Sequence, residues 1–169
     1  MKSLSSPDRL SLQAAIAAFI LASATIAGAW LFQFAGYAPC ELCLKERWPY
    51  YIGAPLAAIA VLVCARGPVR LRAPLLALLG LVFFASFVFG AYHAGVEWRF
   101  WAGPTDCTGH VVAARTMGDF MRQLQTSKVV RCDAVAIRIL GLSLAGWNAV
   151  VSLVVALIAW RGALAARRP

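Results

Sequence analysis

Charged residues are scarce in this chain: Asp, Glu, Lys and Arg make up 14% of its 169 residues, against 62% hydrophobic residues. A soluble domain is closer to half apolar and a quarter charged. One water-soluble core would not bury this much apolar surface, so we expect the bilayer to be the solvent. Acidic residues are fewer than basic ones, with 7 Asp and Glu against 16 Lys and Arg. The net charge of +9 does not form a basic stripe with interleaved aromatics, so no nucleic-acid partner is expected.

The sequence also lacks internal repeats and low-complexity tracts, and its length suits a single integral membrane domain over residues 1–169. A membrane helix needs about 20 apolar residues. The charge-free segments that approach or exceed this length lie at about 12–34, 48–65, 73–92 and 139–160. The first is longer than the apolar part of a signal peptide, and Tyr37-Ala38-Pro39 is a poor cleavage context for a lipoprotein anchored at Cys40. The sequence therefore predicts an all-α fold, a four-helix transmembrane bundle.

The positive residues predict how the bundle is oriented. Equal numbers fall on the two sides, but those of the termini and of loop 66–72 are concentrated in short stretches beside the span ends, where the positive-inside bias acts. We therefore expect cytoplasmic termini and two outer loops, a short one at 35–47 and a long one at 93–138. Aromatic residues near the outer ends should form an interfacial belt: Trp48, Tyr50, Tyr51, Tyr92, Trp98 and Trp101.

The long outer loop contains a short amphipathic pattern. Apolar residues recur at helical spacing at Ala113, Met117, Phe120, Met121 and Leu124. This segment is too short and too polar to span the membrane. It fits a helix lying on the membrane surface, and a small helix packed on the rest of the loop is an equal alternative.

The chain has five cysteines, of which four fall in the predicted outer loops. Cys64 lies near the inner end of its span and fits a small buried hydrophobe. The simplest pairing of the others is Cys40 with Cys43 and Cys107 with Cys132, which sequence alone does not fix. Three uses compete for them: static staples, a zinc site, and thiol–disulfide exchange.

A C-x-x-C ring such as Cys40–Cys43 restricts the unfolded chain only slightly, which argues against a staple. The second pair, 25 positions apart, lacks the tight spacing of structural zinc sites, so no metal is expected. Haem attachment would need His after Cys43, where Leu44 stands. Exchange of electrons between two cysteine pairs, through attack of a thiolate on a disulfide, is the reading most consistent with the pattern.

Two further residues are candidates near the C-x-x-C pair. Arg47 is four positions after Cys43, a spacing that puts both on one face of a helix, and a fixed cation favours the thiolate. A headgroup anchor is the plainer reading of Arg47. His93, at the end of the third span, should emerge on the same outer face, although a lone histidine there is more often structural.

The whole chain resembles the disulfide bond formation protein B (DsbB) family of bacterial inner-membrane thiol oxidases. The resemblance rests on the span order, on Pro39–Cys43 followed by Glu46-Arg47, and on three further stretches: Gly103–Cys107, Cys132-Asp133 and Gly141–Asn148. It implies an enzyme that uses ubiquinone or menaquinone to reoxidise a periplasmic thioredoxin-fold donor of the DsbA kind. We expect the enzyme to be a monomer.

The resemblance also implies roles for residues at matching positions. Cys107 would form the mixed disulfide with the donor and release Cys132, which would attack Cys40. Cys43 would become the thiolate facing the quinone, with Arg47 stabilising the complex or adduct between them. His93 corresponds to a family histidine near the quinone. The interfacial helix of the long loop also fits the family.

Two rival functions follow from the same cysteines. A vitamin-K-epoxide-reductase-like oxidoreductase also joins loop cysteines to a quinone-binding C-x-x-C, but that motif is expected late in the bundle. A membrane scaffold stapled by disulfides would keep all four outer cysteines oxidised and would tolerate replacement of Arg47.

Overall fold

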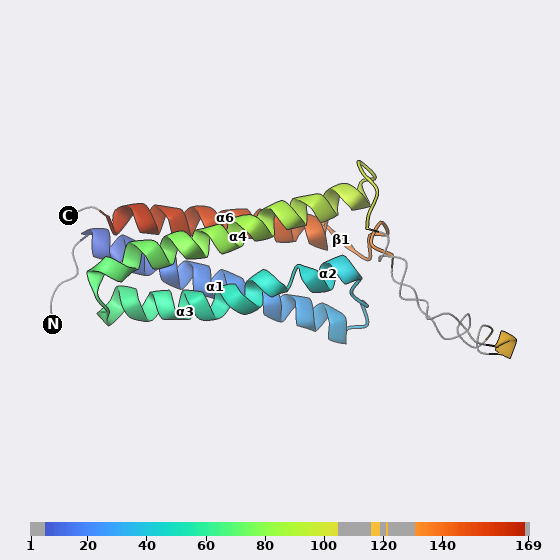
Figure 1. The fold of residues 1–169 in the computed structure, drawn as a ribbon, viewed down its shortest axis with the longest axis horizontal. Helices are drawn as coiled ribbons and strands as arrows, with labels where there is room; N and C mark the ends of the chain where they lie inside the picture. The colour runs from blue at the N-terminus through green and yellow to red at the C-terminus, as the bar shows by residue number, and fades with distance from the viewer. Residues whose placement is uncertain (1–5, 105–115, 119–120, 122–130, 168–169) are drawn as a thin grey trace.

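The computed structural model describes residues 6–104, 116–118, 121 and 131–167. Four long helices lie alongside one another as a bundle (Figure 1): α1 (Ser6–Phe34), α3 (Trp48–Arg66), α4 (Val69–Glu97) and α6 (Leu144–Ala165). Each is long and apolar enough to cross a membrane. The prediction of an all-α four-helix transmembrane bundle is confirmed, and the four apolar helices indicate a multi-pass membrane protein.

The two ends of the bundle carry different elements. The start of α1, the α3–α4 connection and the end of α6 gather at one end (Figure 1). The short helix α2 (Glu41–Lys45) and the strands β1 (Arg138–Ile139) and β2 (Leu142–Ser143) lie at the other. We call the first the terminal end, marked by Asp8 and Arg72, and the second the cysteine end, marked by Cys40 and Cys43. The C-x-x-C pair is thus separated from the start of α1 and the end of α6 by the length of the bundle.

Small residues let the helices approach closely, as is usual between helices in a membrane. The face of α1 toward the bundle is formed by the buried alanines Ala14, Ala15, Ala18 and Ala22. A Cβ added at Gly90 of α4 would lie 3.0 Å from the backbone nitrogen of Ala149 in α6. Larger side chains fill the centre, where Phe83, Leu76 and Leu79 are fully buried.

The observed helices differ from the predicted spans mainly at their ends. α1 begins six residues before position 12, and α4 extends beyond 73–92 at both ends. The helical backbone continues past the charged residues that bound the apolar stretches. Arg72 lies inside α4, and its guanidinium donates to the Asp8 carboxylate of α1. The predicted second span, 48–65, agrees with α3, and Pro49 sits in its first turn, where a missing N–H costs little.

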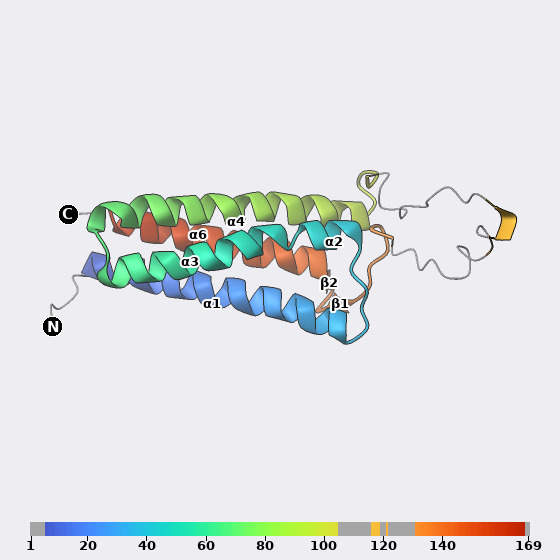
Figure 2. The same cartoon turned by 60° about the horizontal axis from the view of Figure 1, so that its bottom comes forward.

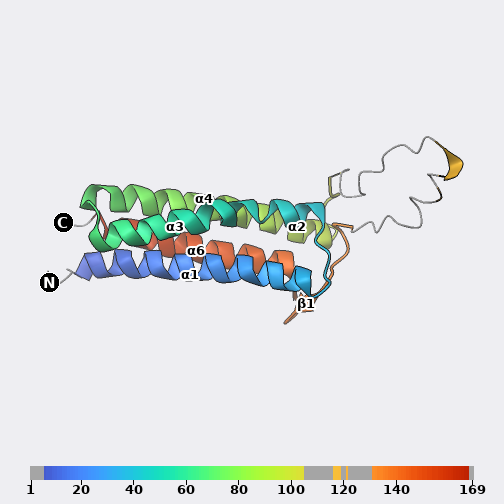
Figure 3. The same cartoon turned by 90° about the horizontal axis from the view of Figure 1, so that it is seen from below.

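The fourth span begins at Leu144, so the predicted start at 139 is wrong. A hairpin occupies the intervening residues, with Ile139 paired to Leu142 and Arg138 to Ser143. The Ser143 hydroxyl accepts a hydrogen bond from the Gly146 backbone N–H at 3.1 Å and so caps α6. Figures 2 and 3 show this hairpin beside the C-terminal end of α1.

The aromatic residues predicted for the interfacial belt divide into two groups. Trp48, Tyr51, Tyr92, Trp98 and Trp101 are exposed. Tyr50 is only 3% exposed, so its assignment to the belt is wrong. Its hydroxyl donates to Asn148 Oδ1 at 2.6 Å and lies 2.9 Å from Ser152 Oγ, which joins α3 to α6. The amphipathic pattern at 113–124 lies largely outside the described residues.

Candidate functional site

The C-x-x-C pair is held by the start of α2. Cys40 is the residue before the helix, and its sulfur accepts a hydrogen bond from the Cys43 backbone N–H at 3.3 Å. This capping geometry turns the two side chains toward each other, and their sulfurs are 2.9 Å apart. Both residues are free thiols in this structure. The short helix therefore positions the two sulfurs for reversible formation of a disulfide.

A histidine and a carboxylate lie behind Cys40. His93 of α4 is 1% exposed; its Nε2 is 3.7 Å from the Cys40 sulfur and its Nδ1 is 2.8 Å from Glu46 Oε1. Glu46 is buried as well, and it follows α2 by one residue. The sulfur, the imidazole and the carboxylate thus form a continuous buried series, in which the carboxylate fixes the orientation of the ring.

These neighbours change the acidity of Cys40. The hydrogen bond with the Cys43 side chain is the largest cause, and with the contact to His93 it outweighs the opposing effect of burial. Together they lower the pKa of the Cys40 thiol to about 4. When the pair is reduced, this arrangement favours a thiolate at Cys40.

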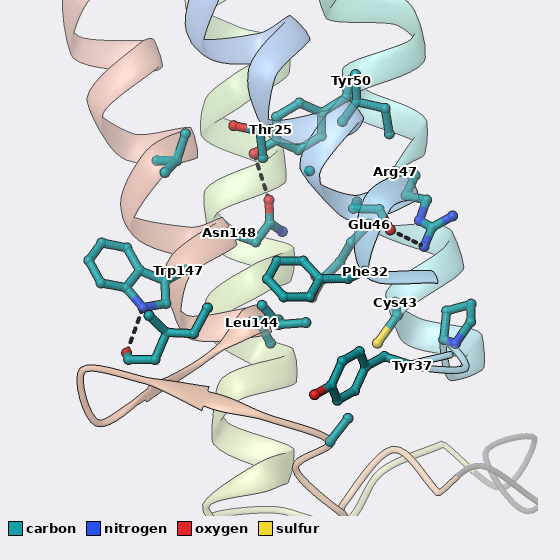
Figure 4. A pocket seen from close by; sticks show the side chains of 18 of the residues that line it. Thr25, Phe32, Tyr37, Cys43, Glu46, Arg47, Tyr50, Leu144, Trp147 and Asn148 are labelled. Atoms are coloured by element: carbon teal, nitrogen blue, oxygen red, sulfur yellow. Dashed lines mark hydrogen bonds between the residues drawn. The ribbon is translucent and has the colours of Figure 1, made fainter. Parts of the chain in front are cut away.

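Cys43 lies at the wall of an apolar cavity of about 330 Å³ between α1, α3 and α6. In Figure 4 its sulfur points to the space beside the rings of Phe32 and Tyr37. Opposite them the wall is formed by the hairpin and the first turn of α6, including Ile139, Leu144 and Trp147. Such a cavity suits an apolar ring system placed against a sulfur.

Arg47 lines the same cavity, but its guanidinium is directed to α1 and not to a sulfur. It donates to Gln33 Oε1 at 2.6 Å and to the Ala29 carbonyl oxygen at 3.3 Å, and it lies 5.2 Å from the centre of the Trp30 ring. These partners are neutral, and within the described part of the chain no carboxylate pairs with Arg47. A buried positive charge at the cavity wall is therefore available to an anion.

His93 is not among the described residues that line this cavity. Its contacts are with Cys40 and with Glu46, which itself lines the cavity. Its predicted contact with a quinone stays a prediction.

Cys132 lies beside the C-x-x-C pair. It is 2% exposed and packs in one buried cluster with Cys40, Leu42 and Val96. It is disulfide-bonded and also borders a second cavity of about 570 Å³, formed by residues between 96 and 104 and by Arg131 and Asp133. Cys107 lies outside the described residues, so its predicted pairing with Cys132 stays a prediction.

Several polar residues at this end were not singled out from the sequence. Glu46 was part of the sequence motif after Cys43, but no role was predicted for it. Its position about one helical turn after Cys43 could have indicated one. Gln33 and Trp30 lie inside an apolar span with no pattern to mark them. The network of Tyr50, Asn148, Ser152 and Ser86 joins three helices, and only packing reveals it.

Comparisons with known proteins give one result. The model of a protein family described as disulfide bond formation protein DsbB matches residues 11–161. A search of curated proteins found no match, and a search of solved structures found none either. The matched segment includes all four cysteines of the predicted relay, as well as Arg47 and His93.

Proposed function

Since the chain belongs to the disulfide bond formation protein DsbB family, we propose that it passes electrons from a thioredoxin-fold donor of the DsbA kind to a membrane quinone. Membership itself makes the protein a disulfide oxidoreductase that forms disulfide bonds by oxidising thiols at a membrane. One observation carries the finer proposal. Cys43 lines the apolar cavity, and Cys40, whose sulfur is 2.9 Å from the Cys43 sulfur, packs in one buried cluster with Cys132.

The residues at the cavity fit a quinone. The lining is mostly apolar, and its polar groups include the Cys43 sulfur, the Arg47 guanidinium and the carboxyl group of Glu46. Because the described partners of that guanidinium are neutral, Arg47 can stabilise the negative charge that develops on a quinone oxygen or on the Cys43 sulfur. A bound quinone would be the oxidant, because it accepts two electrons and two protons. It would be ubiquinone or menaquinone.

The chain's own residues carry out the thiol–disulfide steps. A donor thiolate attacks Cys107 in the Cys107–Cys132 disulfide, and Cys132 leaves as a thiolate. Cys132 then attacks Cys40 in the Cys40–Cys43 disulfide, and Cys43 is released at the cavity wall. The donor's second thiolate then attacks the mixed disulfide and releases Cys107, and Cys107 re-forms its bond to Cys132 by displacing Cys40. Each attack forms one S–S bond and breaks another, so the electron pair ends on the reduced Cys40–Cys43 pair.

We assign His93 to the Cys40 side of the pair. Its Nε2 faces the Cys40 sulfur and its ring is fixed by Glu46, so it holds that sulfur in place while Cys43 stays at the cavity. Arg47, in contrast, acts on the cavity side. His93 thus acts at Cys40, which receives electrons from Cys132, and Arg47 acts at the cavity that would hold the quinone.

The proposed location is the bacterial inner membrane, with both termini in the cytoplasm and the cysteine loops in the periplasm. The gathering of the start of α1 and the end of α6 at one end of the bundle supports this orientation (Figure 1). So does the need of cysteine pairs for a compartment in which disulfides persist. We propose a single membrane domain that acts as a monomer.

Quinol formation tests the proposed function. Purified protein is mixed with a reduced thioredoxin-fold donor and a quinone, and quinol is followed by absorbance. We expect turnover with the natural chain, essentially none with Cys43→Ser, and unchanged turnover with Cys64→Ser, which removes a thiol buried elsewhere. Unimpaired turnover of Cys43→Ser would contradict the mechanism. A disulfide-stapled scaffold would show no turnover with any of the three.

The order of transfer has its own test. In Cys132→Ala, Cys107 is a free thiol, so with oxidised donor it should attack the donor disulfide and accumulate as a mixed disulfide, because no Cys132 remains to displace the donor. Peptide mapping identifies the cysteine that is joined. A donor trapped on Cys40 would show that the order proposed above is reversed.

A further inference from the structure

The C-x-x-C pair and His93 form a group of three ligand atoms that the redox mechanism does not fully explain. The sulfurs of Cys40 and Cys43 and one ring nitrogen of His93 lie within 4.8 Å of one another. From the sequence no metal was expected, because a zinc site of four cysteines would need tighter spacing of the second pair. The third ligand comes from α4, 50 positions along the chain from Cys43.

The distances suit a tetrahedral ion. With Zn–S near 2.3 Å and Zn–N near 2.0 Å, two ligand sulfurs are about 3.8 Å apart, and a sulfur and a nitrogen about 3.6 Å. Cys40 Sγ and His93 Nε2 are already 3.7 Å apart. The two sulfurs, at 2.9 Å, would separate by about 0.9 Å to reach this geometry, which a small rotation of the half-exposed Cys43 side chain provides.

The surroundings of the three atoms also match those of a metal site. A histidine ligand usually donates its other ring N–H to a carboxylate, which fixes the tautomer and the ring orientation. Glu46 Oε1 stands 2.8 Å from His93 Nδ1, so Nε2 is left with its lone pair toward the sulfurs. The Cys43 backbone N–H, 3.3 Å from Cys40 Sγ, stabilises negative charge on that ligand. The cavity that Cys43 lines gives an entry path for an ion.

We propose that the reduced protein binds one thiophilic cation of the Zn²⁺ class through Cys40 Sγ, Cys43 Sγ and His93 Nε2, with Glu46 orienting the histidine. Two sulfurs and an imidazole select such soft or borderline ions over Mg²⁺ or Ca²⁺. Binding displaces the remaining thiol protons to solvent and changes no oxidation state. Formation of the Cys40–Cys43 disulfide removes two of the three ligands, so the site exists only in the reduced protein. A bound ion would therefore block reoxidation, and only this consequence rests on the proposed function.

Cd²⁺ serves as the probe, because thiolate ligation produces an ultraviolet charge-transfer band. The full chain carrying Cys107→Ser and Cys132→Ser is reduced with a phosphine and titrated without donor or quinone, so that the result does not depend on oxidase activity. We expect one equivalent of Cd²⁺ with a thiolate band, competed by Zn²⁺. The same protein with Cys40–Cys43 oxidised should bind none at this site.

Two variants test the histidine. Glu46→Gln should weaken binding by about 10- to 100-fold, as loss of an outer-shell partner does, and His93→Ala should weaken it at least as much. Cys64→Ser is the matched control and should bind as tightly as the parent. Far-ultraviolet circular dichroism confirms that each variant is folded; if His93→Ala is not, Glu46→Gln decides. No thiolate band in the reduced protein, or undiminished affinity in the folded histidine and glutamate variants, would overturn the proposal.

Discussion

Among the described residues, each end of the bundle buries one arginine and at least one cysteine, and the two ends use them differently. At the terminal end, Arg72 donates to the Asp8 carboxylate, and Cys64 is fully buried. At the cysteine end, Arg47 has an amide, a carbonyl and an indole ring as partners, and Cys43 lines a cavity. A paired charge with an enclosed thiol holds helices together, whereas a charge with neutral partners beside an accessible sulfur is positioned to meet an anion.

The largest expected difference between the ends comes from replacing the two arginines. Arg47→Met should lower kcat/KM for the quinone by about 100-fold, because it removes a fixed charge from the place where negative charge develops. Because Gln33 and the Ala29 carbonyl lose a donor, its free energy of unfolding should fall by about 1 kcal/mol. The measurement is quinol formation over a range of quinone concentrations.

Arg72→Met is the matched replacement at the terminal end. It removes the guanidinium that donates to the Asp8 carboxylate across α1 and α4, and should lower the free energy of unfolding by roughly 1–3 kcal/mol, with kcat/KM per folded molecule unchanged. Thermal unfolding in detergent micelles measures the first effect. Equal losses of kcat/KM in the two variants would remove the distinction between the ends.

Two glycines sharpen the same comparison. A Cβ at Gly28 meets open space, and Gly28 lines the cavity, so Gly28→Leu should raise KM for the quinone by about tenfold, the cost of losing roughly 1.4 kcal/mol of binding. A Cβ at Gly162 would lie 2.6 Å from Ala14 Cβ, so Gly162→Ala should destabilise the protein by about 1–3 kcal/mol and leave KM unchanged. Quinone titrations and thermal unfolding of both variants check the pair, and the reverse assignment of effects would contradict it.

The smallest effect on stability is expected for a residue that lies between the two ends, Tyr50. Tyr50→Phe removes the hydroxyl that joins α3 to Asn148 and Ser152 of α6. A hydrogen bond between membrane helices contributes on average about 0.6 kcal/mol, so the unfolding midpoint should fall slightly. A loss of several kcal/mol would mean that this network holds the cysteine end together and is not a local link.

The sequence predicted the bundle because charge-free runs of membrane length are a strong signal. The predicted start of α6 was too early because Ile139 and Leu140 continue the apolar run. Gly141 and the capping Ser143 indicate a turn before the helix. Positive φ angles of 51° at Leu140 and 85° at Gly141 belong to the hairpin turn, which hydropathy does not register.

The candidate site was predictable only in part. Local spacing indicated Cys40, Cys43 and Arg47, because they lie within eight residues of one another. Spacing could not show that Arg47 turns to Gln33 of α1, or that His93 meets Glu46, since both contacts depend on how the helices are packed. Tyr50 was assigned to the membrane interface because composition does not distinguish a lipid-facing tyrosine from one that donates across the core.

The central claim is that electrons pass between the two cysteine pairs through Cys40 and Cys132, which share one buried cluster at the cysteine end. A variant carrying Cys43→Ala and Cys107→Ala leaves each of these thiols without its own pair partner. After mild oxidation and proteolysis, mass spectrometry should find a Cys40–Cys132 disulfide in most molecules, with Cys64 still a free thiol. If Cys40 and Cys132 both remain free under conditions that oxidise the natural pairs, they do not meet, and the relay through them is contradicted.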